Sequence, residues 1–244
     1  MIKQWVKRTG LAIVGIILLA AAPLVYPAPL FAYGVTNDNI TIFSDQPIPE
    51  KEAVAVIKET QEKMQRLPGL LSSHPMQIYI ANTKWRRNWL WIIAPNAGGF
   101  VAPPATGWHT FFSGADFLTN ELIAPTGYRT RPPRTIAYYG AHELTHVAIS
   151  KKAGWTRFYL MPEWVREGVP DYVAMTAESA SLLYAKIGKQ NADLPMMKAH
   201  GVYAPYRLLV TWFLQDAGWT LERLMASDLT LQQARKIVFN ALDG

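Results

Sequence analysis

The segment HELTH at residues 142–146 carries the side chains best suited to chemistry in this sequence. Its two histidines, His142 and His146, are four residues apart, so on a helix both imidazoles face the same side and can bind one Zn²⁺. Glu143 directly follows the first histidine and would overhang the open coordination position of the metal. This arrangement predicts a site that activates water.

The surrounding sequence favours the helix that this arrangement needs. The segment 135–152 contains no proline and ends in two lysines, and Gly154 follows it, where a C-terminal cap is expected. We therefore expect one helix over residues 135–152 to hold both histidines.

A second motif lies downstream, in the segment PEWVREGVPDY at residues 162–172. HELTH followed by W-x-x-E-G and a tyrosine resembles the gluzincin branch of zinc metallopeptidases. The resemblance implies a zincin-like fold and one zinc ion per chain, with Glu167, on a second helix, as the third metal ligand. It also implies that Asp171, one helical turn beyond Glu167, orients His142, since a metal-bound imidazole commonly donates its other N–H to a carboxylate.

Two details bear on this resemblance. The metzincin pattern H-E-x-x-H-x-x-G-x-x-H is not met, because Ile149 and Lys152 occupy the positions of its glycine and last histidine. Pro170 stands where gluzincins usually carry a helix former, and it should either kink the helix or lie within its first turn. A helix that begins only at Val169 would leave Glu167 in the approach to it.

The implied mechanism needs a base and a hydrogen-bond donor for the oxyanion. Glu143 would take the proton of the attacking water and pass it to the leaving amine. Gluzincins supply the donor as a tyrosine or histidine from the C-terminal helical part, where His200, Tyr203 and Tyr206 cluster here. Tyr203 and Tyr206 are equal candidates, because an ordinary buried tyrosine has the same sequence signature.

Residues 1–34 are expected to form a membrane anchor or a signal segment. Three cations within the first eight residues precede an apolar run from Leu11 to Tyr26 that only Pro23 interrupts, and no acidic residue occurs before Asp38. The run approaches the roughly 20 residues of a spanning helix, so we favour a single-pass anchor with the remainder outside the cytoplasm of a prokaryotic cell. The alternative, a cleaved signal, would leave a secreted protein.

Composition limits the partners. The net charge is +6, and three of these charges lie in the first eight residues, so about +3 remains for the rest of the chain. This modest charge argues against a nucleic-acid partner. There is no cysteine, which excludes disulfides and thiolate ligands. The segment KWRRNWLW at 84–91 suits either a lipid headgroup layer or, as we expect, a strand edge and loop whose tryptophans pack on the core.

Strands are expected before helices, which predicts an α+β fold in one domain over residues 35–244. The expected strands cover 39–43, 76–81, 89–94, 98–101 and 110–112. The expected helices cover 50–66, 135–152, 163–179, 182–187, 206–214, 221–225 and 231–242. In gluzincins an edge strand pairs with an extended peptide substrate, and 98–101 and 110–112 are the candidates for it.

These features together predict a membrane-anchored or exported zinc metallopeptidase that acts on peptides or unfolded polypeptides. The alternative is a non-catalytic binding or scaffold protein of the envelope, with a zincin-like fold and a structural metal.

Overall fold

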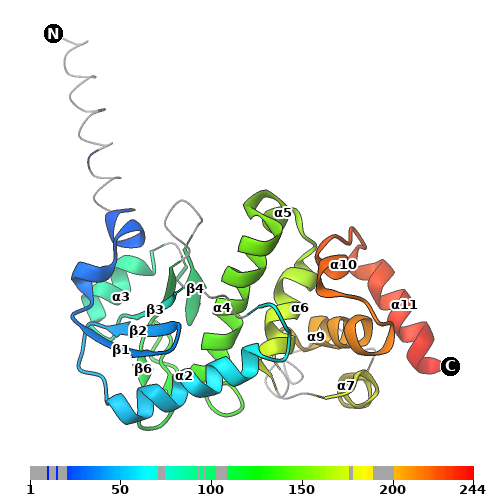
Figure 1. Ribbon diagram of the computed structural model, residues 1–244, viewed down its shortest axis with the longest axis horizontal. Helices are drawn as coiled ribbons and strands as arrows, with labels where there is room; N and C mark the ends of the chain where they lie inside the picture. Colours follow the sequence, from blue (N-terminus) through cyan, green and yellow to red (C-terminus); the bar gives the residue numbers. More distant parts are fainter. Residues whose placement is uncertain are drawn as a thin grey trace. The chain divides into compact units, whose positions relative to one another are not determined.

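The computed structural model has an α+β fold, in which a small mixed sheet precedes a mostly helical remainder (Figure 1). It describes residues 10, 15, 21–70, 75–92, 94–95, 97–102, 109–175, 178–188 and 201–244. The chain divides into two compact units. The sheet unit comprises Met1–Ala55 with His74–Thr130, and the helical unit comprises Val56–Ser73 with Arg131–Gly244.

The main sheet of this unit has five strands in the order β1-β2-β3-β5-β4. Strand β2 is parallel to β3 and β3 to β5, whereas β1 and β4 run antiparallel to their neighbours. The strands are β1 (Tyr33–Asn37), β2 (Ile40–Ser44), β3 (Met76–Ile80), β4 (Gly99–Val101) and β5 (Thr110–Phe112). A short hairpin, β6 (Ala115–Asp116) with β7 (Glu121–Leu122), follows them.

Alternation of side chains gives this sheet two apolar faces. Ile78 and Ile80 of β3 point to one face, and Tyr79 between them points to the other. Tyr79 pairs in register with Phe111 of β5 and packs with it in one buried cluster. Alternate residues of β3 and β5 point to opposite faces of the sheet, and the residues on both faces are largely buried. This explains why the sequences of these two strands are almost continuously apolar.

The expected strand over 89–94 is wrong, because residues 89 and 90 belong to helix α3 (Lys84–Leu90) and residues 91 and 92 form the turn after it. The buried carboxylate of Asp45, at the end of β2, accepts hydrogen bonds from the backbone N–H groups of Asn82 (2.8 Å) and Thr83 (2.9 Å). Asp45 is distant in the sequence, yet these contacts fix the start of α3. The aromatic content of the segment alone therefore does not predict whether it forms a strand or a helix.

Of the two candidate edge strands, only one lies at an edge. Strand β4 pairs on one side alone, with β5, whereas β5 lies between β3 and β4. The backbone of 110–112 is therefore already paired on both sides, and the expectation that it could add a peptide strand is wrong. Among the described residues, no strand pairs with the other edge of β4, and strand addition by a peptide requires such an edge.

The helical unit is built around α4 (Ile136–Ala153), which is buried on most of its surface. The remaining elements are α5 (Trp155–Leu160), α6 (Glu163–Ala174), α7 (Ala180–Ile187), α9 (Ala204–Thr211), the π-helix η3 (Trp212–Asp216), α10 (Leu221–Met225) and α11 (Leu231–Asp243). Helix α2 (Glu50–Met64) connects the two units. The expected helices agree with these elements in number and position, with three differences. The helix expected over 163–179 ends at Ala174, α5 was not expected, and η3 continues α9 beyond residue 214.

Helices α6 and α9 pack closely in this unit, and Gly168 permits the approach. A Cβ atom on Gly168 would lie 2.8 Å from Cγ2 of Val210 and 2.9 Å from the backbone oxygen of Tyr206. The tryptophan of the same motif, Trp164, is fully buried and donates from Nε1 to the Leu229 carbonyl at 2.8 Å. The W-x-x-E-G motif thus contains two residues that pack the helix and one, Glu167, that is left for chemistry.

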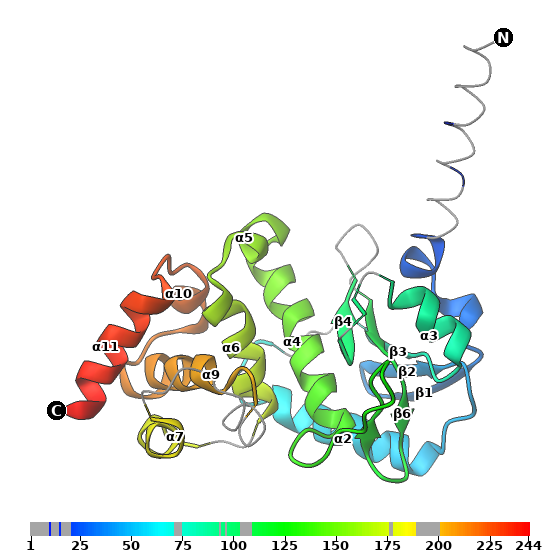
Figure 2. The same ribbon diagram turned by 180° about the vertical axis from the view of Figure 1, so that it is seen from behind.

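Within the described ranges, none of the helices combines the length and apolar character needed to cross a membrane. The expected anchor at 1–34 falls largely on residues outside these ranges, so it stays a prediction. Figure 2 shows the described residues of the same segment from the opposite side.

Candidate metal centre

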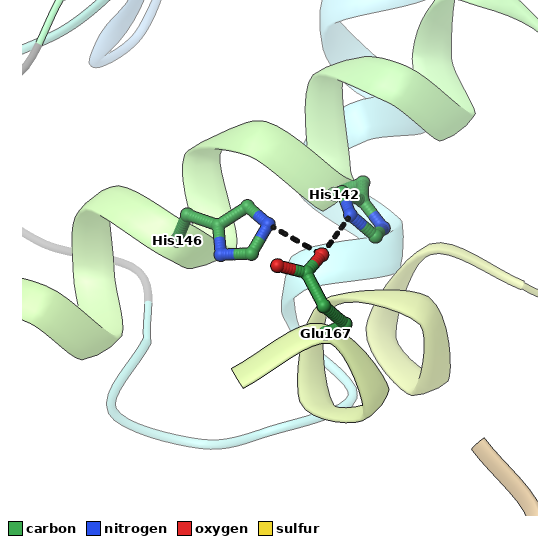
Figure 3. Close-up of side chains that lie close together, drawn as sticks. All are labelled: His142, His146 and Glu167. Atoms are coloured by element: carbon green, nitrogen blue, oxygen red, sulfur yellow. Dashed lines mark ion pairs between the residues drawn. The ribbon is translucent and has the colours of Figure 1, made fainter. Parts of the chain in front are cut away.

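Two histidines of α4 and one glutamate of α6 converge on a single point (Figure 3). Nε2 of His142 lies 3.7 Å from Oε2 of Glu167, and Nε2 of His146 lies 3.4 Å from the same oxygen. The three potential ligand atoms all lie within 4.8 Å of one another. Ligand atoms placed around a tetrahedral zinc ion are about 3.4 Å apart, so this group could hold a metal ion.

Helix α4 and its neighbours restrain both imidazoles. Thr135 caps the helix by accepting a hydrogen bond from the Tyr138 backbone N–H, and the helix places the two histidine rings 5.0 Å apart between centroids. Phe158 of α5 meets the His146 ring edge-on at 6.0 Å, and Tyr203 stacks on the His142 ring at 5.5 Å. Both histidines are buried, so the rings have little freedom to turn away.

Helix α6 supplies Glu167 from within its regular part. The helix begins at Glu163, not at Val169, and continues through Pro170 to Ala174. Pro170 therefore lies beyond the first turn, where it removes the N–H that would otherwise bond the Arg166 carbonyl. Neither the late helix start nor the first-turn position of Pro170 is found, and Glu167 and Asp171 share one helical face.

Charges at this point compensate one another. Burial by itself would lower the pKa of His142, but Glu167, Glu143 and Asp171 outweigh it, so the pKa is raised above its usual value. Burial would raise the pKa of Glu167, but the two imidazoles hold it far below its usual range. The centre is thus an ionised carboxylate beside protonatable imidazoles, and a cation would replace the protons there.

Glu143 lies next to His142 on α4 and is also buried. Burial raises the pKa of its carboxyl, and the nearby His146 and His142 only partly offset this effect. A carboxyl with a raised pKa exchanges protons closer to neutral pH, which suits a general base that later acts as an acid.

The expected hydrogen bond from His142 to Asp171 is not found. Oδ1 of Asp171 accepts from the Tyr138 hydroxyl, and Oδ2 accepts from Nη1 of Arg207, both at 2.6 Å. Nδ1 of His142 and Nδ1 of His146 have no hydrogen-bond partner among the described residues. Asp171 instead neutralises a buried cation, which would otherwise be very costly to bury, and it influences His142 only through its charge.

Arg207 of α9 is the site residue that sequence analysis missed. Its side chain is 5% exposed and that of Asp171 is 3% exposed, so the ion pair is buried. The available signal was an arginine followed by the apolar run LLVTWFL, which is unusual unless the charge is paired inside the protein. Only the fold shows that its partner is Asp171.

The structure separates the two candidate tyrosines. Tyr203 stacks on His142, and its pKa is raised far above the usual range by burial and then by the charges of Glu167 and Glu143. The ring of Tyr206 lies beyond that of Tyr203 as seen from His142, and the centroids of the two tyrosine rings are 6.2 Å apart. Burial and then the charge of Glu163 raise the pKa of Tyr206. Tyr203 is thus the tyrosine beside the metal-binding group, and His200 lies outside the described residues.

Removing the cation of the buried pair should destabilise the fold. We expect Arg207→Met to lower the free energy of unfolding by about 3–5 kcal/mol, because the Asp171 carboxylate stays buried without its partner. Tyr138→Phe should cost less, about 1–3 kcal/mol, since it removes one hydrogen bond to the same carboxylate. Urea unfolding of the metal-free protein, followed by circular dichroism, measures both.

A matched control is the exposed ion pair of Lys152 with Glu222, whose atoms are 2.9 Å apart. Lys152→Met should cost at most about 1 kcal/mol, because both side chains are solvated. Equal losses for Arg207→Met and Lys152→Met would show that the buried pair is not a stabilising contact.

Comparison of the sequence with models of known protein families and with curated proteins finds no match.

Proposed function

We propose that this chain is a zinc-dependent metallopeptidase of the gluzincin type with a zincin-like fold. The observation that carries the proposal is the convergence of His142, His146 and Glu167, with the carboxyl of Glu143 buried beside them. Two imidazoles and one carboxylate form the ligand set of catalytic zinc sites that hydrolyse peptides. Its substrates would be peptides or unfolded polypeptides, outside the cytoplasm if the N-terminal segment acts as an anchor or signal.

Zinc is the metal that we propose for this donor set, because His142, Glu143 and His146 have the H-E-x-x-H spacing of zinc sites. The ligands combine imidazole nitrogens with one carboxylate, and the chain has no thiolate that would select copper(I) or an iron–sulfur cluster. Three protein ligands would leave one coordination position for water or substrate, which is the mark of a catalytic rather than a structural zinc site.

The protein residues would divide the chemistry between them. Bound zinc lowers the pKa of a water molecule toward neutrality and polarises a carbonyl group. Glu143 would accept the proton of the attacking water at its carboxylate and return it to the nitrogen of the leaving amine. Tyr203 would donate a hydrogen bond to the carbonyl oxygen on which negative charge develops, because its hydroxyl remains protonated.

Zinc should stabilise the protein in a manner that depends on pH. The raised pKa of His142 means that protonation stabilises the metal-free fold below 6.5, the usual value, and that this stabilisation is lost as pH rises through the raised pKa. Zinc requires deprotonated imidazoles, so the zinc-induced increase in Tm should grow between about pH 5 and pH 8. Differential scanning calorimetry with zinc or with chelator measures the increase.

Elemental analysis of the same samples should find one zinc ion per chain. His142→Ala should lose both the bound zinc and the zinc-induced increase in Tm. An increase that persists in His142→Ala, or that does not change with pH, would place the bound metal elsewhere.

Replacing the proposed base should separate chemistry from metal binding. Glu143→Gln is expected to lower peptide cleavage by about 10²–10⁴-fold, because the amide cannot accept the proton, while zinc content stays unchanged. Cleavage of a peptide library, read by mass spectrometry, and elemental analysis give the two measurements. Glu163→Gln, an exposed position at the start of α6, is the control and should keep full activity.

Undiminished cleavage by Glu143→Gln would contradict the assigned base. A wild-type protein that binds zinc but cleaves no peptide would instead favour the binding or scaffold protein with a structural metal.

The two tyrosines should differ in their effect on catalysis. Tyr203→Phe is expected to lower kcat by about 10²–10³-fold with little change in KM, since the lost hydrogen bond would act on the transition state. Tyr206→Phe should remain close to wild type, because its ring lies beyond Tyr203. Steady-state kinetics on one cleaved peptide measures both variants, and equal losses would contradict the distinction.

A further inference from the structure

One surface of the sheet unit exposes large apolar side chains next to cations. Trp85 on α3 is 53% exposed and Ile92 after it is 73% exposed. Val25 and Tyr26, at the end of the N-terminal apolar run, are 52% and 70% exposed. We call the aromatic–basic face the set Val25, Tyr26, Lys84, Trp85 and Ile92, together with Arg87, which is half-buried and flanks Lys84 on α3.

These residues come from two segments that pack together. Leu24 and Leu30 contact the same buried cluster as Leu90 and Trp91, at the end of α3. Both views show residues 21–30 beside α3 (Figures 1 and 2). The buried Leu90 faces the cluster, and Trp85 and the exposed Lys84 lie on other faces of α3. The chain thus emerges from its N-terminal apolar run directly beside this face.

The segment that carries α3 is cationic because it contains lysine and arginine but no acidic residue. The sequence contains no aspartate or glutamate from Lys63 to Ala115. Arg86 is compensated by the buried carboxylate of Asp45 at 3.4 Å. Lys84 and Arg87 form no ion pair with any residue in the described part of the chain, so their charges are available to a partner.

The combination of side chains matches a lipid surface. Tryptophan and tyrosine are favoured at the boundary between headgroups and acyl chains, and lysine and arginine are attracted to anionic headgroups. Trp85 and Trp89 stack at 6.2 Å between centroids, and the guanidinium of Arg86 lies 4.5 Å from the centre of the Trp85 ring. The segment therefore presents broad amphipathic rings together with positive charge, and α3 carries no acid that an anionic surface would repel.

We propose that the aromatic–basic face rests on the surface of an anionic lipid bilayer. Trp85 and Ile92 insert at the headgroup level, and Lys84 and Arg87 contact the lipid phosphates. This contact holds the sheet unit against the bilayer, in addition to any attachment by residues 1–34. It is independent of the proposed peptidase activity, since no residue of the metal-binding group belongs to the face.

The absence of cysteine allows a direct test with the full-length chain. Ile92→Cys, labelled with an environment-sensitive fluorophore, is reconstituted into vesicles of phosphatidylglycerol and phosphatidylcholine. We expect the emission of the label to shift to shorter wavelength and to be quenched by lipids that carry a quencher on the acyl chain. Leu118→Cys is the matched control, because Leu118 is also apolar and 77% exposed but lies in the β6–β7 hairpin. Its label should remain in water.

The cations supply a second measurement. Each is expected to contribute roughly fivefold to the ratio of docked to undocked protein, so Lys84→Gln with Arg87→Gln should lower this ratio by roughly 25-fold. The quenching at residue 92 should fall in this variant and in vesicles of phosphatidylcholine alone.

Three results would overturn the proposal. The first is a label at residue 92 that stays as exposed to water as the label at residue 118. The second is equal quenching in anionic and zwitterionic vesicles, which would remove the role of lipid charge. The third is protection of the label only after membrane proteins are added, which would assign the face to a protein partner.

Discussion

A buried carboxylate needs a compensating charge, and this need governs the arrangement of the helical unit. Glu167 is largely buried, and its compensating partners are the imidazoles of His142 and His146. The compensation requires α6 to lie against the histidine-bearing side of α4. Gly168 next to Glu167 lets α6 also approach α9 closely, so the position of the carboxylate is determined from both sides. Because a protonated His142 and a metal ion both supply positive charge, the same geometry stabilises the metal-free fold and suits a cation.

A second buried charge lies one helical turn further along α6. Asp171 binds Arg207 of α9 and Tyr138 of α4, so this single carboxylate connects three helices. Tyr138 stays protonated and can donate, because burial and then the charge of Asp171 raise its pKa well above the usual value. The face of α6 that carries Glu167 and Asp171 thus holds two compensated charges in a row. This explains how a proline can lie between them, since side-chain contacts maintain a helix that has lost one backbone hydrogen bond.

The proposed chemistry and the proposed surface attachment would involve separate parts of the chain. The metal-binding residues, Glu143 and Tyr203 all belong to the helical unit, and the aromatic–basic face belongs to the sheet unit. The tryptophan-rich segment at 84–91 contains both buried and exposed residues. Leu90 and Trp91 are buried in the cluster beside the sheet, as expected for core tryptophans, whereas Trp85 remains exposed. Its helical form, which sequence analysis took for a strand, is what separates these two kinds of residue onto different sides.

The sequence by itself determined the helix that carries HELTH, the placement of His142 and His146 on one side of it, and the α+β order of elements. These follow from local spacing: two residues four apart on a helix face one side, whatever surrounds them. The motif around Glu167 named a third ligand, and the structure brings that residue to the histidines. Only the tertiary structure decided the partner of Asp171, which of Tyr203 and Tyr206 lies beside His142, the helical state of α3 and the interior position of β5. Each of these depends on a contact between residues far apart in the chain, such as Asp171 with Arg207 or Asp45 with Thr83, and local spacing carries no information about such contacts.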